Sequence, residues 1–476
     1  MQFLYLIFAI AGLIWAGVIM LRGGLIAGSL VVLLAGSCFG HAFYNLPANP
    51  IPITSDRLLL VVLAVQAVVF WKLGLLNAKS WGKAEYVLVA FMAVLSLSTI
   101  THDWTIDNNQ PAAKLVFFYG MPLMLYCIAR QATITARQAR WMFGLFAGFG
   151  VYLSLTAYAE VHEMWAWVFP RYIGWEKFEE YLGRGRGPFL NPTGCGLIIT
   201  LCMCCALTFW KTADRFGRAL IVVLTLVYAV GIYYTLTRSV WMGAAVALLI
   251  MIAAGLNAKA RVGLMAASGL AGIVFLIWQW DSLTHFKRDR DVSVSDMTES
   301  AELRPLLAAV SWQMFLDRPV TGCGFGQYSE KNKTYLSDRS LGLNLEKTRP
   351  YVQHNVFLAL LTETGLLGAG LFVSLLGLWA HSAWRLFRNP GAPAWARQLG
   401  LVFLAFLAAY LINGMFHDTG IVPSLHMYFF FMAAVVSGLT AGIPRFGSLP
   451  SNAAQREQGP SSDVDVTLPE ASLAAH

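Results

Sequence analysis

Stretches of about 20 predominantly apolar residues recur along the 476 residues of this chain, and they constrain its fold more than any other feature. A helix of that length crosses the roughly 30 Å hydrocarbon core of a bilayer. Inside a membrane the backbone must satisfy its own hydrogen bonds, so repeated runs predict an all-α polytopic membrane helix bundle. The charged fraction agrees with this prediction: it is 13%, against about 25% in soluble domains.

Thirteen apolar segments are long enough to count as candidate spans. They lie at about 2–20, 24–45, 58–76, 85–100, 114–129, 141–160, 190–210, 219–236, 239–256, 263–280, 355–380, 398–416 and 425–442. The total is 12 if one short early segment only enters the bilayer. We therefore expect about 12–13 transmembrane helices.

Basic residues occupy every second connection between these segments. They are Arg22; Lys79 and Lys83; Arg130, Arg137 and Arg140; Lys211, Arg215 and Arg218; Lys259 and Arg261; Arg385, Arg388 and Arg397; and Arg445. Because basic loops stay in the cytoplasm, this alternation predicts an external N-terminus, and it argues against a cleaved signal peptide. The net charge of +8 is explained by these loops, so no nucleic-acid partner is predicted.

The spans and loops divide the chain into six parts. N-terminal helices occupy 1–160, an external loop 161–189, central helices 190–280, a large external loop 281–353, C-terminal helices 354–442, and a cytoplasmic tail 443–476. The tail is rich in Ser, Pro, Ala and acidic residues and is expected to be disordered. Within the large loop, apolar residues at helical spacing over 301–315 predict an amphipathic helix.

No cofactor or metal is predicted. The seven cysteines show neither a disulfide pattern nor the spacing of a metal site. The chain also has no phosphate-binding glycine loop and no acidic metal-binding cluster.

Three residues at the outer ends of spans are candidates for chemistry. Arg238 lies in a very short external connection, Arg304 on the predicted loop helix, and His354 where the large loop meets the next span. Each has a structural alternative. The alternative for Arg238 is an arginine at a helix end whose side chain extends to the membrane surface. For Arg304 it is a surface ion pair with Glu302, and for His354 it is a helix cap.

Glu363 lies inside an otherwise apolar run, where a carboxylate is costly unless it is paired or faces water. Nine helical residues separate it from His354 by roughly 13 Å and about half a turn. The two side chains should therefore point to opposite faces, with Glu363 toward the bundle. We count Glu363 and Asn355 as candidate substrate-binding residues, together with Arg184 and Arg186, whose glycine-rich segment could bind phosphate.

Several motifs together resemble the O-antigen ligase and O-antigen polymerase family of bacterial membrane glycosyltransferases. They are Thr237-Arg238-Ser239-Val240-Trp241-Met242-Gly243; Arg304 through Trp312; Asp317-Arg318-Pro319-Val320-Thr321-Gly322-Cys323-Gly324-Phe325-Gly326; and His354-Asn355 through Glu363-Thr364-Gly365-Leu366-Leu367-Gly368. The segment Gly185-Arg186-Gly187-Pro188-Phe189-Leu190-Asn191-Pro192 is also similar to the start of the family's central block. The resemblance covers roughly 180–380.

The resemblance implies that the chain moves a glycan from an undecaprenyl-diphosphate carrier to a glycan, lipid or protein acceptor at the outer face of the inner membrane. It assigns the family's two important arginines to Arg238 and Arg304 and its histidine to His354. The chemistry fits, because guanidinium groups bind diphosphate in a bidentate manner. An imidazole can also accept a proton from an attacking sugar hydroxyl.

Two classes of function remain open from the sequence. The alternative to a glycosyltransferase is a polytopic transporter for a small anion or a polysaccharide component. A transporter should place ionisable groups near the middle of the bilayer, whereas Arg238, Arg304 and His354 fall at its outer surface. That position favours the enzyme, and it leaves polymerase, ligase and protein O-oligosaccharyltransferase as alternatives.

Overall fold

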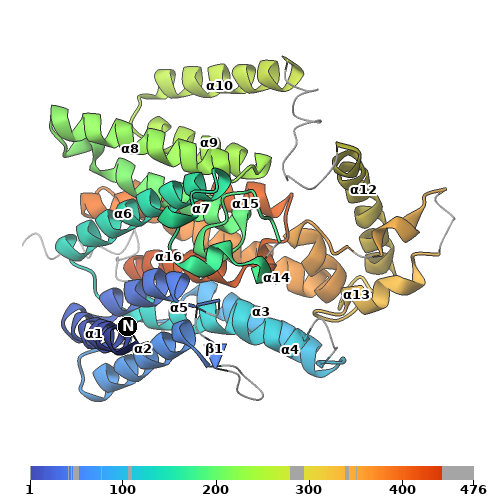
Figure 1. Ribbon diagram of the computed structural model, residues 1–476, viewed down its shortest axis with the longest axis horizontal. Helices are drawn as coiled ribbons and strands as arrows, with labels where there is room; N and C mark the ends of the chain where they lie inside the picture. Colours follow the sequence, from blue (N-terminus) through green and yellow to red (C-terminus); the bar gives the residue numbers. More distant parts are fainter. Residues whose placement is uncertain are drawn as a thin grey trace, which may run out of the picture. The chain divides into compact units, whose positions relative to one another are not determined.

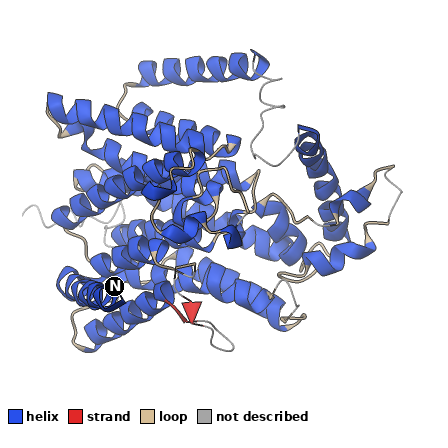
Figure 2. Cartoon of the chain, viewed as in Figure 1, coloured by secondary structure: helices blue, strands red, loops and turns tan. Residues whose placement is uncertain are grey.

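The computed structural model describes residues 2–441 apart from 41, 44, 47–52, 77, 106–109, 179, 279–293, 338–341 and 350. Apart from loops and turns, the described part is helical, with one short antiparallel ribbon of β1 (Asn45–Leu46) and β2 (Ile53–Thr54), drawn in red in Figure 2. An all-α polytopic bundle is therefore confirmed.

The larger elements follow one another along the chain with few long connections. They are α1 (Gln2–Cys38), α2 (Ser55–Lys72), α3 (Lys83–Ile100), α4 (Pro111–Lys114), the π-helix η1 (Leu115–Gly120), α5 (Met121–Gln131), α6 (Ala136–Val161), α7 (Pro192–Leu207), α8 (Arg215–Tyr234), α9 (Arg238–Ala253), α10 (Ala258–Trp278), α12 (Val294–Asp317), α13 (Tyr328–Lys331), α14 (Val356–Arg388), α15 (Ala394–Gly414) and α16 (Pro423–Ala441). Short 3₁₀ helices fill the loops, namely η2 (Trp165–Trp167), η3 (Arg171–Gly174), η4 (Glu176–Phe178), η5 (Gly187–Phe189), η6 (Thr208–Lys211), η7 (Asn332–Thr334), η8 (Leu345–Thr348) and η9 (Thr419–Ile421).

Within the described residues, 9 helices are long and apolar enough to cross a membrane. Each of the thirteen predicted segments is nevertheless helical. The first two segments lie in α1, which is interrupted at Gly24, and only the second of them is among the nine. The segments that form α2, α9 and α10 are not among the nine either. α2 carries Asp56, Arg57 and Lys72, and α9 has only 16 residues. These nine are counted over the described residues only, so the total of 12–13 spans stays a prediction.

The core of the bundle is built around α7 and α16. Of the residues in the spans of α7 and α16, 83% and 78% are buried, whereas the share in α8 is 22%. α7 and α16 therefore lie inside the bundle, and α8 lies at its periphery. α16 packs on α5, α14 and α15, while α7 packs on α6, α8, α9 and α15. Small side chains allow this close packing: a methyl group on Gly196 of α7 would overlap Val240 of α9.

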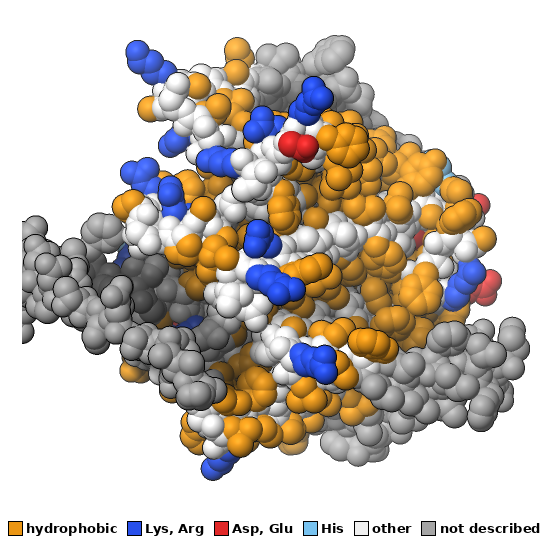
Figure 3. Space-filling model, turned by 90° about the vertical axis from the view of Figure 1, so that its left-hand side faces the viewer, with side chains coloured by type: hydrophobic (Ala, Val, Ile, Leu, Met, Phe, Trp, Pro, Cys, Tyr) orange, Lys and Arg blue, Asp and Glu red, His pale blue; other side chains and the backbone are white. Residues whose placement is uncertain are grey.

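The two ends of the bundle differ in character. α12 and α13 stand together at one end, on the right in Figure 1. The opposite face, shown in Figure 3, carries many Lys and Arg side chains and few acidic ones. A face of this kind is what the alternation of basic loops predicts for the cytoplasmic end. The assignment of the ends to the two sides of the membrane stays a prediction.

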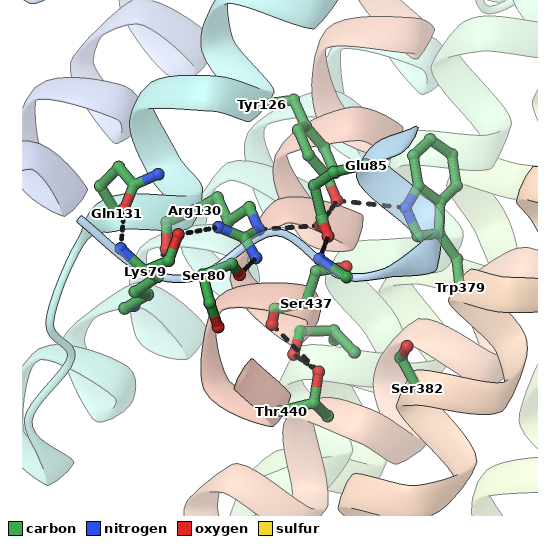
Figure 4. A network of polar contacts seen from close by, with 12 residues as sticks. Lys79, Ser80, Glu85, Tyr126, Arg130, Gln131, Trp379, Ser382, Ser437 and Thr440 are labelled. Carbon is green, nitrogen blue, oxygen red and sulfur yellow. Dashed lines mark hydrogen bonds and ion pairs between the residues drawn. The ribbon is translucent and has the colours of Figure 1, made fainter. Parts of the chain in front are cut away.

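A buried polar network links the start of α3 with α5 (Figure 4). Arg130 Nε lies 2.7 Å from Glu85 Oε1, and Tyr126 Oη donates to the same oxygen at 2.7 Å. The remaining guanidinium nitrogens donate to the backbone carbonyls of Lys79 and Ser80. Because buried charges are tolerated only when they are paired and hydrogen-bonded, this network has a structural role.

α14 is bent sharply at Gly365, where φ is 62° and ψ is −162°. The rings of Phe357 and Phe372 lie 6.2 Å apart, although 15 residues of straight helix would separate them by roughly 22 Å. The predicted span 355–380 is therefore not one continuous rod. Its first part, residues 356–364, folds back against the second.

The large loop satisfies the backbone groups that this bend leaves unpaired. In a straight helix the N–H groups of Leu366 and Leu367 would bind the carbonyls of Thr362 and Glu363. They donate instead to Pro319 and Val320, at 2.8 and 3.3 Å, while Cys323 and Gly324 donate to the two carbonyls, at 2.9 Å each. Segment 319–324 thus replaces the missing helical hydrogen bonds.

Glycines allow this segment to fit. Gly322, Gly324 and Gly326 all have positive φ, at 71°, 110° and 71°. A methyl group on Gly324 would lie 2.7 Å from the ring of His102, and one on Gly326 would lie 2.9 Å from Pro111. The glycine turn is therefore wedged between α14 and the ends of α3 and α4, where only residues without a Cβ fit.

Candidate functional site

Asn355 is the N-cap of α14 and determines where His354 stands. Its Oδ1 accepts hydrogen bonds from the N–H groups of Phe357 at 2.9 Å and Leu358 at 3.0 Å. Its Nδ2 donates to the carbonyl of Met415 at 3.1 Å. Asn355 therefore ties the start of α14 to the α15–α16 connection, residues 415–422, and leaves the exposed His354 beside that connection.

Arg304 lies on α12, which packs against α14. Its guanidinium carbon is 6.0 Å from the ring centre of Phe416, a residue of the same α15–α16 connection. The predicted amphipathic helix is present but begins earlier, at Val294, so Arg304 lies within the helix and not in its first turn. The buried face of α12 carries Leu303, Leu307, Val310 and Met314, and the half-buried Arg304 lies beside it.

Arg238 is the first residue of α9, which packs along α15. A methyl group on Gly243 of α9 would lie 2.8 Å from Asn413 Nδ2, near the end of α15. The start of α9, which carries Arg238, therefore lies at the same end of the bundle as the end of α15. Arg304 and Asn355, the neighbour of His354, thus both contact residues 415–422, and the start of α9 with Arg238 packs near the end of α15.

Arg184 holds the turn that carries Arg238. Its Nε donates to the carbonyl of Thr235 at 3.2 Å, and its Nη2 donates to Thr237 Oγ1 at 2.5 Å. Next to it, the N–H of Gly185 donates to the carbonyl of Tyr234 at 2.8 Å. These contacts support a positioning role for Arg184, and the substrate contact that its glycine-rich sequence suggested stays a prediction.

Arg186 is fully buried. Its Nη1 donates to the carbonyls of Phe178 and Glu180, its Nη2 to that of Ile173, and its Nε lies 3.5 Å from Glu160 Oε2. Burial lowers the pKa of this arginine, and the charge of Glu160 counteracts the effect. With its guanidinium bound to these internal partners, Arg186 holds the 161–189 loop on the bundle.

Glu363 is half-buried and faces the glycine turn. Its Oε2 accepts a hydrogen bond from the N–H of Gly326 at 2.9 Å. It lies at the bend of α14, nine residues from the exposed His354. This contact explains how a carboxylate is tolerated within an apolar run, and it makes Glu363 a support for the wedge rather than a partner of His354.

Asp418 is a residue whose importance the sequence did not indicate, because an acidic residue at a helix end is usually solvated. Its side chain accepts a hydrogen bond from the N–H of Gly420 at 3.0 Å and caps η9. Burial, followed by the negative charge of Glu363, raises the pKa of Asp418 to about 7. The α15–α16 connection therefore contains a carboxyl group that changes protonation near neutral pH.

His426, in the α16 helix that follows this connection, makes two further polar contacts. His426 Nδ1 donates to the carbonyl of Phe118 at 2.9 Å, and its Nε2 accepts from Tyr410 Oη at 3.0 Å. Phe118 belongs to the π-helix η1, whose wider turn leaves a carbonyl free for such a bond. The contact fixes the neutral histidine in one tautomer and anchors α16 to η1.

A comparison with known protein families relates part of this chain to one of them. A family model described as O-antigen ligase matches residues 197–373. Residues 197–373 therefore form an O-antigen ligase domain. The matched segment contains Arg238, Arg304, His354 and Glu363, so the resemblance seen in the motifs is confirmed. None of the curated proteins matches the chain.

This O-antigen ligase domain, together with the candidate spans of the described residues, indicates a multi-pass membrane protein with an O-antigen ligase-type function in polysaccharide biosynthesis. Arg184, Arg186 and Asp418 lie outside the matched segment. Within the described ranges, no three His, Cys, Asp or Glu residues are grouped as a metal site would require. The catalytic roles of individual residues are proposals.

Proposed function

We propose that this protein is a glycosyltransferase that moves or polymerises a glycan from an undecaprenyl-diphosphate donor. The reaction takes place at the outer face of the bacterial inner membrane. The observation that supports it most is that Arg304 and Asn355, the neighbour of His354, both contact residues 415–422, while the start of α9 with Arg238 packs near the end of α15.

In the proposed reaction, Arg238 and Arg304 bind the diphosphate. The bond between the anomeric carbon and the diphosphate oxygen breaks, and its electron pair leaves with the diphosphate, whose charge the guanidinium groups stabilise. The acceptor hydroxyl forms the new bond to the anomeric carbon, and His354 takes the hydroxyl proton as general base. Arg184 and Asn355 position these groups through the contacts described above.

The energy for transfer is stored in the lipid diphosphate, so the proposed reaction requires neither a nucleotide nor a metal ion. The acceptor is a glycan, a lipid or a protein, and the glycan profile of a deletion strain distinguishes these cases. Accumulation of long unattached lipid-linked chains indicates a ligase, and accumulation of single repeat units indicates a polymerase.

The experiment that tests the proposal is His354→Asn in purified protein. We expect wild-type melting and donor binding, because the exposed imidazole has no capping role, while turnover falls roughly 100-fold or more as general-base catalysis is lost.

Asn355→Ala is the matched structural control. It removes the cap and the bond to Met415, and should lower the free energy of unfolding by about 1 kcal/mol. Near wild-type turnover in His354→Asn would remove His354 from the mechanism. If that variant does not fold, a wild-type pH–rate profile with no group titrating near the usual histidine pKa would refute the role.

A further inference from the structure

A cavity of about 360 Å³ lies between the α1–α2 pair and α16, outside the site just described. Its walls come from the end of α1, the start of α2, η1, η5 and the start of α16. Ligand cavities in proteins usually measure about 300–1,000 Å³. This one has room for a single hydrocarbon chain, but not for two chains together with a headgroup.

Polar and apolar residues are sorted along the depth of this cavity. Asp56 and Arg57 lie in the first turn of α2, and Ser424 lies in the first turn of α16. Leu33 lies five residues before the end of α1, and Met427 lies four residues after the start of α16, which places both roughly 6–8 Å deeper. The cavity therefore has a polar rim and an apolar floor, which is the pattern of a site for an amphiphile.

The rim carries one charge of each sign. Of the described residues that line the cavity, only Asp56 and Arg57 are charged. The guanidinium carbon of Arg57 stands 3.7 Å above the ring centre of Phe117. Asp56 Oδ1 is buried and makes no hydrogen bond to any described residue. A buried carboxylate oxygen of this kind is costly unless a ligand or water donates to it.

These charges discriminate between lipid headgroups. A diphosphate would gain the attraction of Arg57 but would meet the repulsion of Asp56 at the same rim. A zwitterionic headgroup matches both charges, because its phosphate binds a guanidinium and its ammonium donates to a carboxylate.

We propose that this cavity binds one zwitterionic phospholipid of the phosphoethanolamine type. Its phosphate lies at Arg57, its ammonium at Asp56, and one acyl chain lies on the apolar floor formed by Leu33 and Met427. The site is separate from the glycan-transfer site and does not depend on the proposed reaction. A lipid bound there joins the α1–α2 pair to the core of the bundle and stabilises the folded protein by mass action.

The test is native mass spectrometry of the full-length protein released from nanodiscs that contain equal amounts of phosphatidylethanolamine and phosphatidylglycerol. We expect one retained phosphatidylethanolamine, favoured over phosphatidylglycerol by about tenfold because the glycerol headgroup lacks the ammonium. Equal retention of the two lipids, no retained lipid, or displacement of the phosphatidylethanolamine by added undecaprenyl phosphate would each overturn the proposal.

Variants separate the two halves of the headgroup site. Asp56→Asn should lose the preference between the lipids, and Arg57→Gln should lose retention of both. Met427→Trp should fill the floor and release the lipid. Lys72→Gln is the matched control, because Lys72 is an exposed cation at the other end of α2, and it should retain lipid as the wild type does. If a variant fails to fold, the wild-type competition decides alone.

Discussion

At the scale of the residue, the proposed site depends on the shape of arginine as well as on its charge. Arg304→Lys and Arg238→Lys keep the positive charge but lose the planar fork that binds two phosphate oxygens. Each change should weaken transition-state stabilisation by about 2–5 kcal/mol if the contact to the diphosphate is desolvated. Steady-state kinetics with a lipid-diphosphate donor measures the loss.

Arg349→Lys is the control for these two variants. Arg349 belongs to the same large loop and forms an exposed ion pair with Glu346 at 2.5 Å. Such pairs contribute little to stability, so this variant should turn over as the wild type does. Unchanged kinetics in both Arg304→Lys and Arg238→Lys would show that the diphosphate is bound elsewhere.

Asp418 gives the molecule a pH dependence of stability. Burial raises the pKa of this carboxyl from its ordinary 3.8 to about 7. The folded state therefore binds a proton more tightly than the unfolded state. The stabilising contribution is fully present below the unfolded pKa and is lost as the pH rises through about 7.

We expect the melting temperature in detergent to fall as the pH rises from about 4 to about 7, and Asp418→Asn to flatten this part of the profile because the amide does not titrate. Thermal melts across the pH range provide the measurement. The same slope in wild type and variant would assign the dependence to another group.

At the scale of the element, the bend in α14 requires a glycine. The backbone of Gly365 lies in a region that residues with a Cβ rarely adopt, and a methyl group there would overlap the carbonyl of Val320. Gly365→Ala should therefore lower the free energy of unfolding by at least about 1–3 kcal/mol. It should also displace segment 319–324 and lower turnover.

Gly370→Ala tests the same substitution on the same helix without a clash. Gly370 is helical, and a methyl group there meets nothing within 4 Å. Stability should be unchanged, or raised by up to about 1 kcal/mol from helix propensity. Equal melting temperatures for the two variants would mean that the bend is not needed for the fold.

At the scale of the whole molecule, the basic face of Figure 3 predicts the orientation in the membrane. A cysteine in place of Ser337, on the large loop, should react with an impermeant reagent in intact cells. A cysteine in place of Ser461, in the C-terminal tail, should react only after the membrane is opened. The opposite pattern would reverse the topology and exclude a reaction at the outer face.

Hydropathy alone determined which segments become helices. In lipid an unsatisfied backbone group costs several kcal/mol, so a long apolar run has to be helical whatever its neighbours are. This is why the predicted spans between 55 and 441 match helices to within a few residues, except at the end of α14, which continues to Arg388 instead of ending at 380. The short motifs also identified the family, since Arg238, Arg304 and His354 all fall in the segment matched as O-antigen ligase.

Only the tertiary structure decided what the polar residues do. The glycine-rich sequence around Arg184 and Arg186 resembles that of a phosphate-binding turn. In the structure, Arg184 donates to a carbonyl group of the α8–α9 turn, and Arg186 donates to carbonyl groups of the 161–189 loop. The bend of α14 likewise depends on segment 319–324, more than 40 residues earlier in the chain than Gly365. Such partners come from distant parts of the sequence. A local pattern cannot specify them, because the cost of burying a charge or of breaking a helix depends on what packs against it.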